Sequence, residues 1–281
     1  MSLLAAAIAG AGCGGDRESD GRPNVVASFY PLAYAADRIG GDHVRVQNLT
    51  APGVEPHDIE LSPRQVDQID AARLVFVLGR DFQPAVERVA KGHRGGIALL
   101  DQLRVAGDDP HVWLDPVLME GVVGRIGIAL RNADPVNGED YVAHVNSLLD
   151  DLIALDGRYR TGLAHCARTE IVTNHEAFGR LAARYGLTQR AVTGLSPEAE
   201  PSPARLAELT DLIRRAGVTT VFTEELVSPR VAQALAREAG VRTEVLNPIE
   251  GLTKAQAKRG ATYLTLMDTN LAKLRQALDC T

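Results

Sequence analysis

The chain has 281 residues, of which 45% are hydrophobic, so it can bury a substantial core, and its length favours two modest domains over one large one. Its net charge is −6 and its pI is near 5.7. These values argue against nucleic acid as a partner, because phosphate binding needs clustered Lys and Arg and the sequence has no such run.

The N-terminus has the character of an export signal. Residues 3–9 form an apolar run that is too short to span a bilayer, which takes roughly 20 helical residues. The next four residues, Gly-Ala-Gly-Cys, resemble a bacterial lipobox in which Cys13 would be lipidated, although glycine replaces the usual aliphatic residue and no Lys or Arg precedes the run. We expect residues 1–23 to be signal, lipobox and flexible tether. The alternative is an ordinary Ala/Gly-rich tail.

Short β-branched runs alternate with helical patterns along the first half of the chain. We expect strands at residues 24–29, 44–49, 74–78 and 97–100. We expect helices at residues 32–39, 62–69, 84–90 and 116–131. Strands that alternate with helices imply a parallel sheet built from right-handed crossover units. The sequence therefore predicts an α/β domain at residues 24–134.

A longer helix follows this domain. From Tyr141 to Leu163, apolar residues recur every three or four positions, which traces one stripe along a helix of roughly 40 Å. We assign residues 135–165 to this helix. The stripe by itself indicates only that one face is buried.

The second half of the chain repeats the alternation. We expect strands at residues 170–173, 189–192, 218–222 and 241–246. We expect helices at residues 177–185, from 202, at 228–240 and at 254–278. These elements predict a second α/β domain at residues 166–281. If Cys13 carries lipid, Cys166 and Cys280 remain, and an even remainder in an exported protein suggests a disulfide, although two free thiols remain possible.

Three histidines share one local setting. His57, His111 and His175 each follow an apolar, strand-like run and precede a helix start. His111 lies between two Asp-Pro pairs, which favour a short extended segment that aims one imidazole. Open α/β sheets bind ligands beyond the carboxyl ends of their strands, so the three rings could converge on one zinc-type site. The other histidines lack this setting and are interpreted as structural or exposed: His43, His93, His144 and His165.

Four sequence blocks carry a specific resemblance. They are Gly-Val-Glu-Pro-His-Asp-Ile-Glu at 53–60, Asp-Pro-His-Val-Trp-Leu-Asp-Pro at 109–116, Thr-Asn-His-Glu-Ala-Phe at 173–178 and Glu-Ala-Glu-Pro-Ser at 198–202. Together, and in this order, they resemble the zinc/manganese solute-binding proteins of bacterial ABC importers, over nearly the whole chain after the N-terminal tail. The resemblance implies two parallel-sheet α/β lobes joined by a single long helix, with a metal site in the interlobe cleft.

The same resemblance implies a set of partners and a location. The chain would be a monomeric, extracytoplasmic receptor, anchored to the cell membrane through lipid on Cys13, that serves an ABC permease and a separate ATPase. The sequence has no Gly-x-x-x-x-Gly-Lys-Ser/Thr loop for ATP, which agrees with a separate ATPase subunit.

The resemblance also implies the ligands. His57 and His111 would come from the first lobe and His175 from the second, and histidine at 175 favours Zn²⁺, with Mn²⁺ or Fe²⁺ as the alternative cargo. The family often has an Asp in a Leu-Asp-Pro segment as fourth ligand, and Asn247 stands in the matching position here. Other candidates for the fourth position are Glu55, Glu224, Glu225 and water. Because all three rings must be neutral, we expect metal affinity to fall below about pH 6.5.

A zinc hydrolase or hydratase is the alternative from another functional class. Three histidines and one open position also describe catalytic zinc, with Glu55 or Glu176 as a general base. The sequence lacks a His-Glu-x-x-His helix, and we therefore favour a receptor that is not an enzyme. Surface adhesion is a role of some relatives that nothing in the sequence distinguishes from metal delivery.

Overall fold

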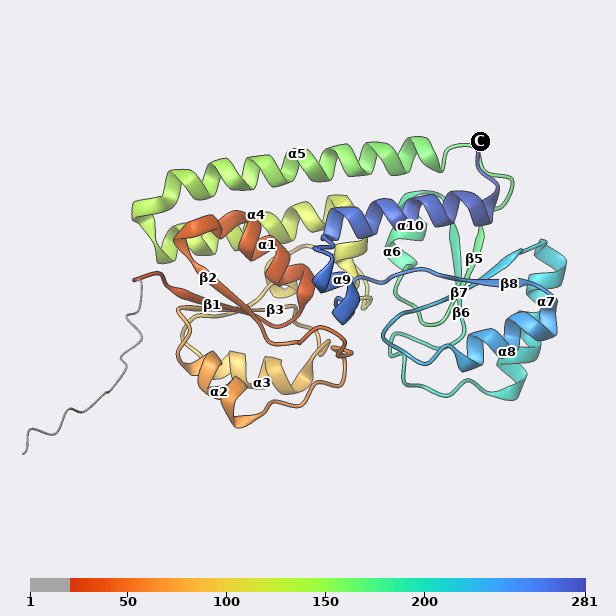
Figure 1. Ribbon diagram of the computed structural model, residues 1–281, viewed down its shortest axis with the longest axis horizontal. Coiled ribbons are helices and arrows are strands. Elements are labelled where there is room, and N and C mark those ends of the chain that lie inside the picture. The colour runs from red at the N-terminus through yellow and green to blue at the C-terminus, as the bar shows by residue number, and fades with distance from the viewer. Residues whose placement is uncertain (1–20) are drawn as a thin grey trace, which may run out of the picture.

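The computed structural model describes residues 21–281, so Cys13 and most of the expected signal and tether lie outside the described residues. Two four-stranded parallel sheets lie side by side, each covered by helices (Figure 1). No helix within residues 21–281 combines the length and the apolar character needed to cross a membrane. The expected α/β fold of two parallel-sheet lobes with a long helix is confirmed. The exact domain boundaries at 24–134, 135–165 and 166–281 stay a prediction.

The first lobe is built on a sheet with the order β2-β1-β3-β4. Its strands are β1 (Asn24–Ala27), β2 (Arg45–Asn48), β3 (Leu74–Val77) and β4 (Gly96–Ala98). Its helices are α1 (Tyr30–Gly40), α2 (Pro63–Asp70), α3 (Pro84–Gly92) and α4 (Pro116–Ala133). Successive strand residues point to opposite faces, so Val25 belongs to the core under α1 and α4 while Val26 belongs to the core over α2 and α3.

The second lobe repeats this topology with the order β6-β5-β7-β8. Its strands are β5 (Glu170–Thr173), β6 (Thr188–Ala191), β7 (Thr220–Thr223) and β8 (Arg242–Val245). Its helices are α6 (Gly179–Arg184), α7 (Pro203–Ala216), α8 (Arg230–Ala239), α9 (Lys254–Lys258) and α10 (Tyr263–Leu278). Because the strands are parallel in both sheets, the loops that leave their carboxyl ends can meet between the lobes.

Helix α5 (Gly138–Gly162) has 25 residues and runs along both lobes (Figure 1). The predicted stripe is its buried face, which includes Tyr141, Leu148, Leu152, Leu155 and Tyr159. This face joins one hydrophobic core that extends from α1 and α4 of the first lobe to α10 of the second. The shared core favours limited motion between the lobes.

The final predicted helix is wrong in one respect, because residues 254–278 form two helices and not one. Gly260 lies between them with a φ of 69°, a left-handed conformation that glycine adopts without strain. Thr262 then caps α10, because its side chain accepts a hydrogen bond from the backbone N–H of Thr265. Both signals are visible in the sequence.

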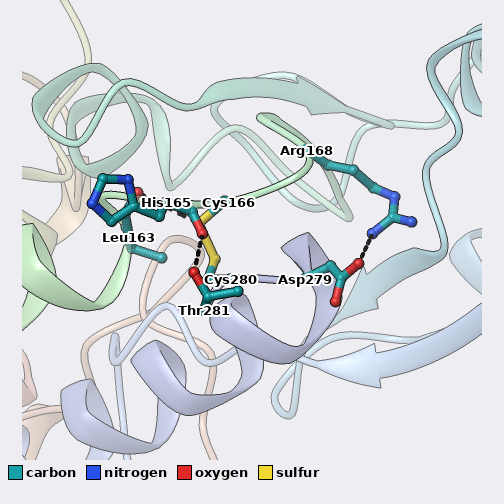
Figure 2. Close-up of a disulfide and its surroundings, with 7 residues drawn as sticks. All are labelled: Leu163, His165, Cys166, Arg168, Asp279, Cys280 and Thr281. Carbon is teal, nitrogen blue, oxygen red and sulfur yellow. Dashed lines mark hydrogen bonds and ion pairs between the residues drawn. A yellow bond between two sulfur atoms is a disulfide. The ribbon is translucent and has the colours of Figure 1, made fainter.

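A disulfide joins Cys166 to Cys280, which confirms the suggested pair and excludes two free thiols (Figure 2). Cys166 follows α5 and Cys280 follows α10, so the bond ties the end of the chain to the start of the second lobe. An ion pair between Arg168 and Asp279 and a hydrogen bond from the Thr281 N–H to the His165 carbonyl lie beside it. The bond closes a loop with a sequence separation of 114 residues.

We expect the double substitution Cys166→Ser and Cys280→Ser to lower the free energy of unfolding by about 4 kcal/mol. The reason is that a long open loop returns conformational entropy to the unfolded chain. Urea unfolding of the metal-free protein measures the difference, with reduced wild type as the matched control. Metal stoichiometry should not change, because the disulfide contributes no atom to the site described below. A loss of less than about 1 kcal/mol would contradict this account.

Candidate metal centre

Four side chains from distant parts of the sequence meet between the two lobes. They are His57, His111, His175 and Glu250, and one potential ligand atom from each lies within 4.8 Å of the others. The ring centroids of the three histidines are 5.3 to 5.8 Å apart. His111, His175 and Glu250 are buried, and the side chain of His57 is 10% exposed. The structure therefore brings together all three histidines selected from the sequence.

His175 is placed by the strand that precedes it. β5 is a buried strand that ends at Thr173, and His175 follows after one residue. Its backbone carbonyl accepts hydrogen bonds from the Thr173 hydroxyl and from the Gln189 amide, at 2.8 and 2.9 Å. This position at the carboxyl end of a central strand is the one that the sequence pattern predicted.

His57 is placed by the loop after β2 and by an aromatic contact. The Gln83 amide donates to the Pro56 carbonyl at 3.1 Å, and the Phe82 ring lies edge-on to the His57 ring with centroids 4.5 Å apart. Phe82 follows a tight turn in which Gly79, Arg80 and Asp81 all have positive φ. Such a turn stores backbone strain, and here it directs an aromatic side chain onto a candidate ligand.

His111 does not lie at a strand tip, which corrects the extended segment expected from the sequence. β4 ends at Ala98, and residues Val112–Leu114 form a 3-10 turn in which the Leu114 N–H donates to the His111 carbonyl. An extended segment would alternate its side chains between two faces, whereas this turn buries three successive apolar residues. The Trp113 indole also donates to the Pro248 carbonyl at 2.7 Å.

Two carboxylates orient the buried rings. Nδ1 of His111 lies 2.7 Å from Asp109 Oδ1, and Nδ1 of His175 lies 2.7 Å from Glu224 Oε2. A carboxylate accepts a proton-bearing Nδ1, so each ring directs Nε2 toward the site. These two Nε2 atoms are buried and form no well-directed hydrogen bond among the described residues, although each lies within 3.4 Å of a Glu250 oxygen. Buried ring nitrogens and a carboxylate oxygen this close together suit a metal cation.

Glu250 lies at the centre of the three rings. Its Oε1 atom is 3.3, 3.4 and 3.2 Å from Nε2 of His57, His111 and His175, respectively. Burial opposes ionisation, but the three histidines outweigh it and hold the pKa of Glu250 well below its usual range. Burial alone would lower the pKa of His175, but Glu224 and Glu250 raise it to about 10. The site therefore favours positive charge around one buried carboxylate.

Asn247, the fourth ligand expected from the sequence, has both amide groups engaged by other residues. Its amide oxygen accepts the Ile249 N–H at 2.7 Å, and its amide nitrogen donates to Glu225 at 2.7 Å. Ile249 has a φ of 59°, which is strained for a β-branched residue. The Asn247 side chain therefore stabilises a turn that directs Glu250 into the site. Glu250, three residues after Asn247, is a buried ligand candidate that sequence reasoning missed.

The other carboxylates proposed as a fourth ligand or a general base lie outside this cluster of four side chains. Glu224 accepts from both the backbone N–H and Nδ1 of His175, so it orients a ring and does not face the centre. Glu55 accepts the backbone N–H of His57 at 2.9 Å. Burial, and then the charge of Glu250, raises the pKa of Glu55 to about 8. Glu176 is exposed, which does not suit a general base beside a buried metal.

The site and fold match a known family. The family described as "ZnuA: Zinc-uptake complex component A periplasmic" matches residues 25–277. The chain is 35% identical, over 98% of its length and 94% of the relative, to the protein named "High-affinity zinc uptake system protein ZnuA" of Bacillus subtilis. It is 34% identical to the "Zinc-binding lipoprotein AdcA" of Streptococcus pneumoniae serotype 4, and it spans 61% of the length of that relative.

A solved structure has the same fold. The Zn(II)-bound ZnuA-like domain of Streptococcus pneumoniae AdcA superposes with a TM-score of 0.80 at 36% identity. The match covers 92% of this chain and 100% of that domain. The two-lobed fold is therefore that of a relative whose solved structure is zinc-bound.

Proposed function

We propose that this chain, which belongs to the ZnuA family of periplasmic components of zinc-uptake complexes, captures one Zn²⁺ ion outside the cytoplasm and delivers it to an ABC permease. The observation that carries this proposal is the meeting of His57, His111, His175 and Glu250 between the two lobes. Because the ligands come from both lobes, one bound ion would join them and make occupancy recognisable to a permease.

The donor set favours zinc over other divalent cations. Three borderline imidazole nitrogens and one carboxylate oxygen make a four-ligand set of the kind that zinc accepts readily. Mn²⁺ prefers more oxygen ligands, and Fe²⁺ binds such sites less tightly than zinc. Glu250 supplies one negative charge to the ion, and the carboxylates of Asp109 and Glu224 stabilise the ligating rings from behind.

The same donor set argues against a zinc hydrolase. Catalytic zinc keeps one position open for water or substrate, whereas the three histidines and Glu250 would complete a tetrahedron. The family consists of uptake components, and its named relatives are zinc-binding proteins. Capture and release of the ion, without bond-breaking chemistry, is the activity that this geometry supports.

We further propose that the receptor is a monomer anchored to the cell membrane through lipid on Cys13, with the permease and its ATPase as separate polypeptides. The pneumococcal relative is named a lipoprotein, which supports the anchor. The disulfide between Cys166 and Cys280 supports an oxidising, extracytoplasmic location, because reducing cytosol rarely keeps such bonds.

Metal content and metal competition test this function. The purified full-length chain should hold about one zinc per molecule. After removal of the metal with a chelator, zinc should rebind and should displace manganese and ferrous iron. Preferential binding of manganese would assign a different cargo, and a protein that holds no metal would contradict the receptor function.

Asn247 offers a test of how the fourth ligand is held. We expect Asn247→Asp to weaken zinc binding by about 10- to 100-fold, because the new carboxylate faces Glu225 and disturbs the turn before Glu250. If Asn247 were itself a ligand, the change to a carboxylate would strengthen binding instead. Competitive titration with a chelating dye separates the two outcomes. Asn146→Asp, at an exposed position on α5, is the matched control and should bind zinc like the wild type.

A further inference from the structure

Two arginines on α6 reach from the second lobe to the segment that carries His111. Nε of Arg180 donates to the Asp109 carbonyl at 2.8 Å, and its Nη2 donates to the Ala106 carbonyl at 3.1 Å. One helical turn later, Arg184 forms an ion pair with the side chain of Asp115. The arginine side chains are 13% and 24% exposed, so solvent screens these contacts only in part.

The two aspartates flank His111 and fix the ends of its turn. Asp109 Oδ1 accepts from both the backbone N–H and Nδ1 of His111, at 2.9 and 2.7 Å. Asp115 caps α4 by accepting the Val117 N–H at 3.0 Å. α6 starts directly against the first aspartate, since a Cβ atom at Gly179 would lie 3.2 Å from Asp109 Oδ2.

The second lobe also holds the other side of this turn. The Trp113 indole donates to the Pro248 carbonyl, and the Tyr263 hydroxyl donates to the Trp113 carbonyl at 2.5 Å. Segment 109–115 precedes α5 in the sequence. The residues that hold it, namely Arg180, Arg184, Pro248 and Tyr263, all follow α5. His111 is therefore fixed to the same framework as His175, which lies just before α6, and Glu250, which follows Pro248 closely.

We propose that α6 acts as an interlobe clamp, in which Arg180 and Arg184 are positioning residues that hold His111 against His175 and Glu250 and slow release of the bound ion. This inference rests on the proposed function and adds residues that control residence time. A guanidinium can donate to two carbonyls at once, and a lysine ammonium cannot reproduce this planar fork. Exposed ion pairs contribute little, but these contacts are largely buried and act on backbone that carries a ligand.

Zinc dissociation kinetics test the clamp. We expect Arg180→Gln and Arg184→Gln to release zinc to excess chelator about tenfold faster than the wild type, with an association rate that changes less than about twofold. Arg180→Lys keeps the charge without the fork and should also release zinc several-fold faster. Arg190→Gln is the matched control, because Arg190 pairs with Glu170 on the surface with 43% of its side chain exposed, and it should behave like the wild type.

Small-angle scattering of the metal-free protein measures the radius of gyration. This value should change if the arginines hold the two lobes together, but not if they only stabilise α6. The double variant Arg180→Gln with Arg184→Gln should have a larger radius of gyration than the metal-free wild type, and zinc should restore the smaller value. Wild-type release rates in Arg180→Lys and Arg184→Gln, together with unchanged scattering of the double variant, would overturn the clamp. A wild type that binds no zinc would instead refute the proposed function, while the scattering comparison would still test the clamp.

Discussion

Replacing Glu250 by glutamine is expected to weaken zinc binding by two to three orders of magnitude, although the two side chains have nearly the same shape. An apparent binding free energy of about 10–16 kcal/mol for a four-ligand zinc site corresponds to roughly 2.5–4 kcal/mol per ligand. Glutamine would also leave a dication among neutral donors in a buried site, where uncompensated charge is costly.

Competition with a chelator of known affinity, at constant pH, measures this change. Glu208→Gln is the matched control, because Glu208 is an exposed residue of α7 whose side chain is 61% accessible. The control should bind zinc as the wild type does. An affinity of Glu250→Gln within about tenfold of the wild type would remove Glu250 from the ligand set and return the fourth position to water or to another carboxylate.

Acid is expected to release zinc over a wider pH range than the ordinary pKa of histidine implies. Burial lowers the pKa of both buried rings, but Glu224 and Glu250 outweigh it and raise the pKa of His175 to about 10, and Asp109 and Glu250 raise the pKa of His111. Below about pH 10, zinc must therefore displace at least one proton, and each displaced proton lowers the apparent affinity up to tenfold per pH unit as the pH falls. This expected onset lies well above the pH of about 6.5 that the sequence suggested.

Calorimetry in buffers with different ionisation enthalpies counts these protons. At neutral pH, we expect the protein to release about one or more protons for each zinc ion bound. His144→Gln is a suitable control, because His144 Nδ1 contacts the Ile39 carbonyl at the end of α1, and this substitution should not alter the count. A dissociation constant that is the same at pH 7 and pH 9, without proton release, would contradict the raised pKa values.

The regular elements were largely predictable because their signals are local. The predicted strand at 170–173 coincides with β5, since a short β-branched run is enclosed by polar residues. The apolar stripe from Tyr141 to Leu163 identified the buried face of α5 before any fold was known. Prolines after Ser62 and Ser202 marked the starts of α2 and α7, where both serines cap the helix.

The misjudged features depend on contacts between distant residues. His111 lies on a 3-10 turn because Trp113 is buried and bonded to Pro248, 135 residues away, which no local pattern encodes. Asn247 was the expected ligand because it stands where the family often has the Asp of a Leu-Asp-Pro segment, but Asn270, 23 residues away, binds its backbone and fixes the turn. Only this turn, with its left-handed Ile249, directs Glu250 toward the histidines.

The three histidines could be selected from the sequence because each follows an apolar, strand-like run and precedes a helix start. The alternatives for the fourth ligand could not be ranked from the sequence, because several carboxylates, Glu55 and Glu224 among them, lie close to a candidate histidine or to a strand end. Their hydrogen bonds to backbone N–H groups and to a ring nitrogen distinguish them from Glu250. Such bonds depend on tertiary structure.

The most direct measurement is a crystal structure of the zinc-loaded protein with an anomalous difference map collected at the zinc edge. We predict one strong peak, with Nε2 of His57, His111 and His175 and one oxygen of Glu250 at about 2.0–2.2 Å. A zinc ion bound elsewhere, or one that leaves any of the three histidines outside its coordination sphere, would contradict the central claim that imidazoles from both lobes share a single cation.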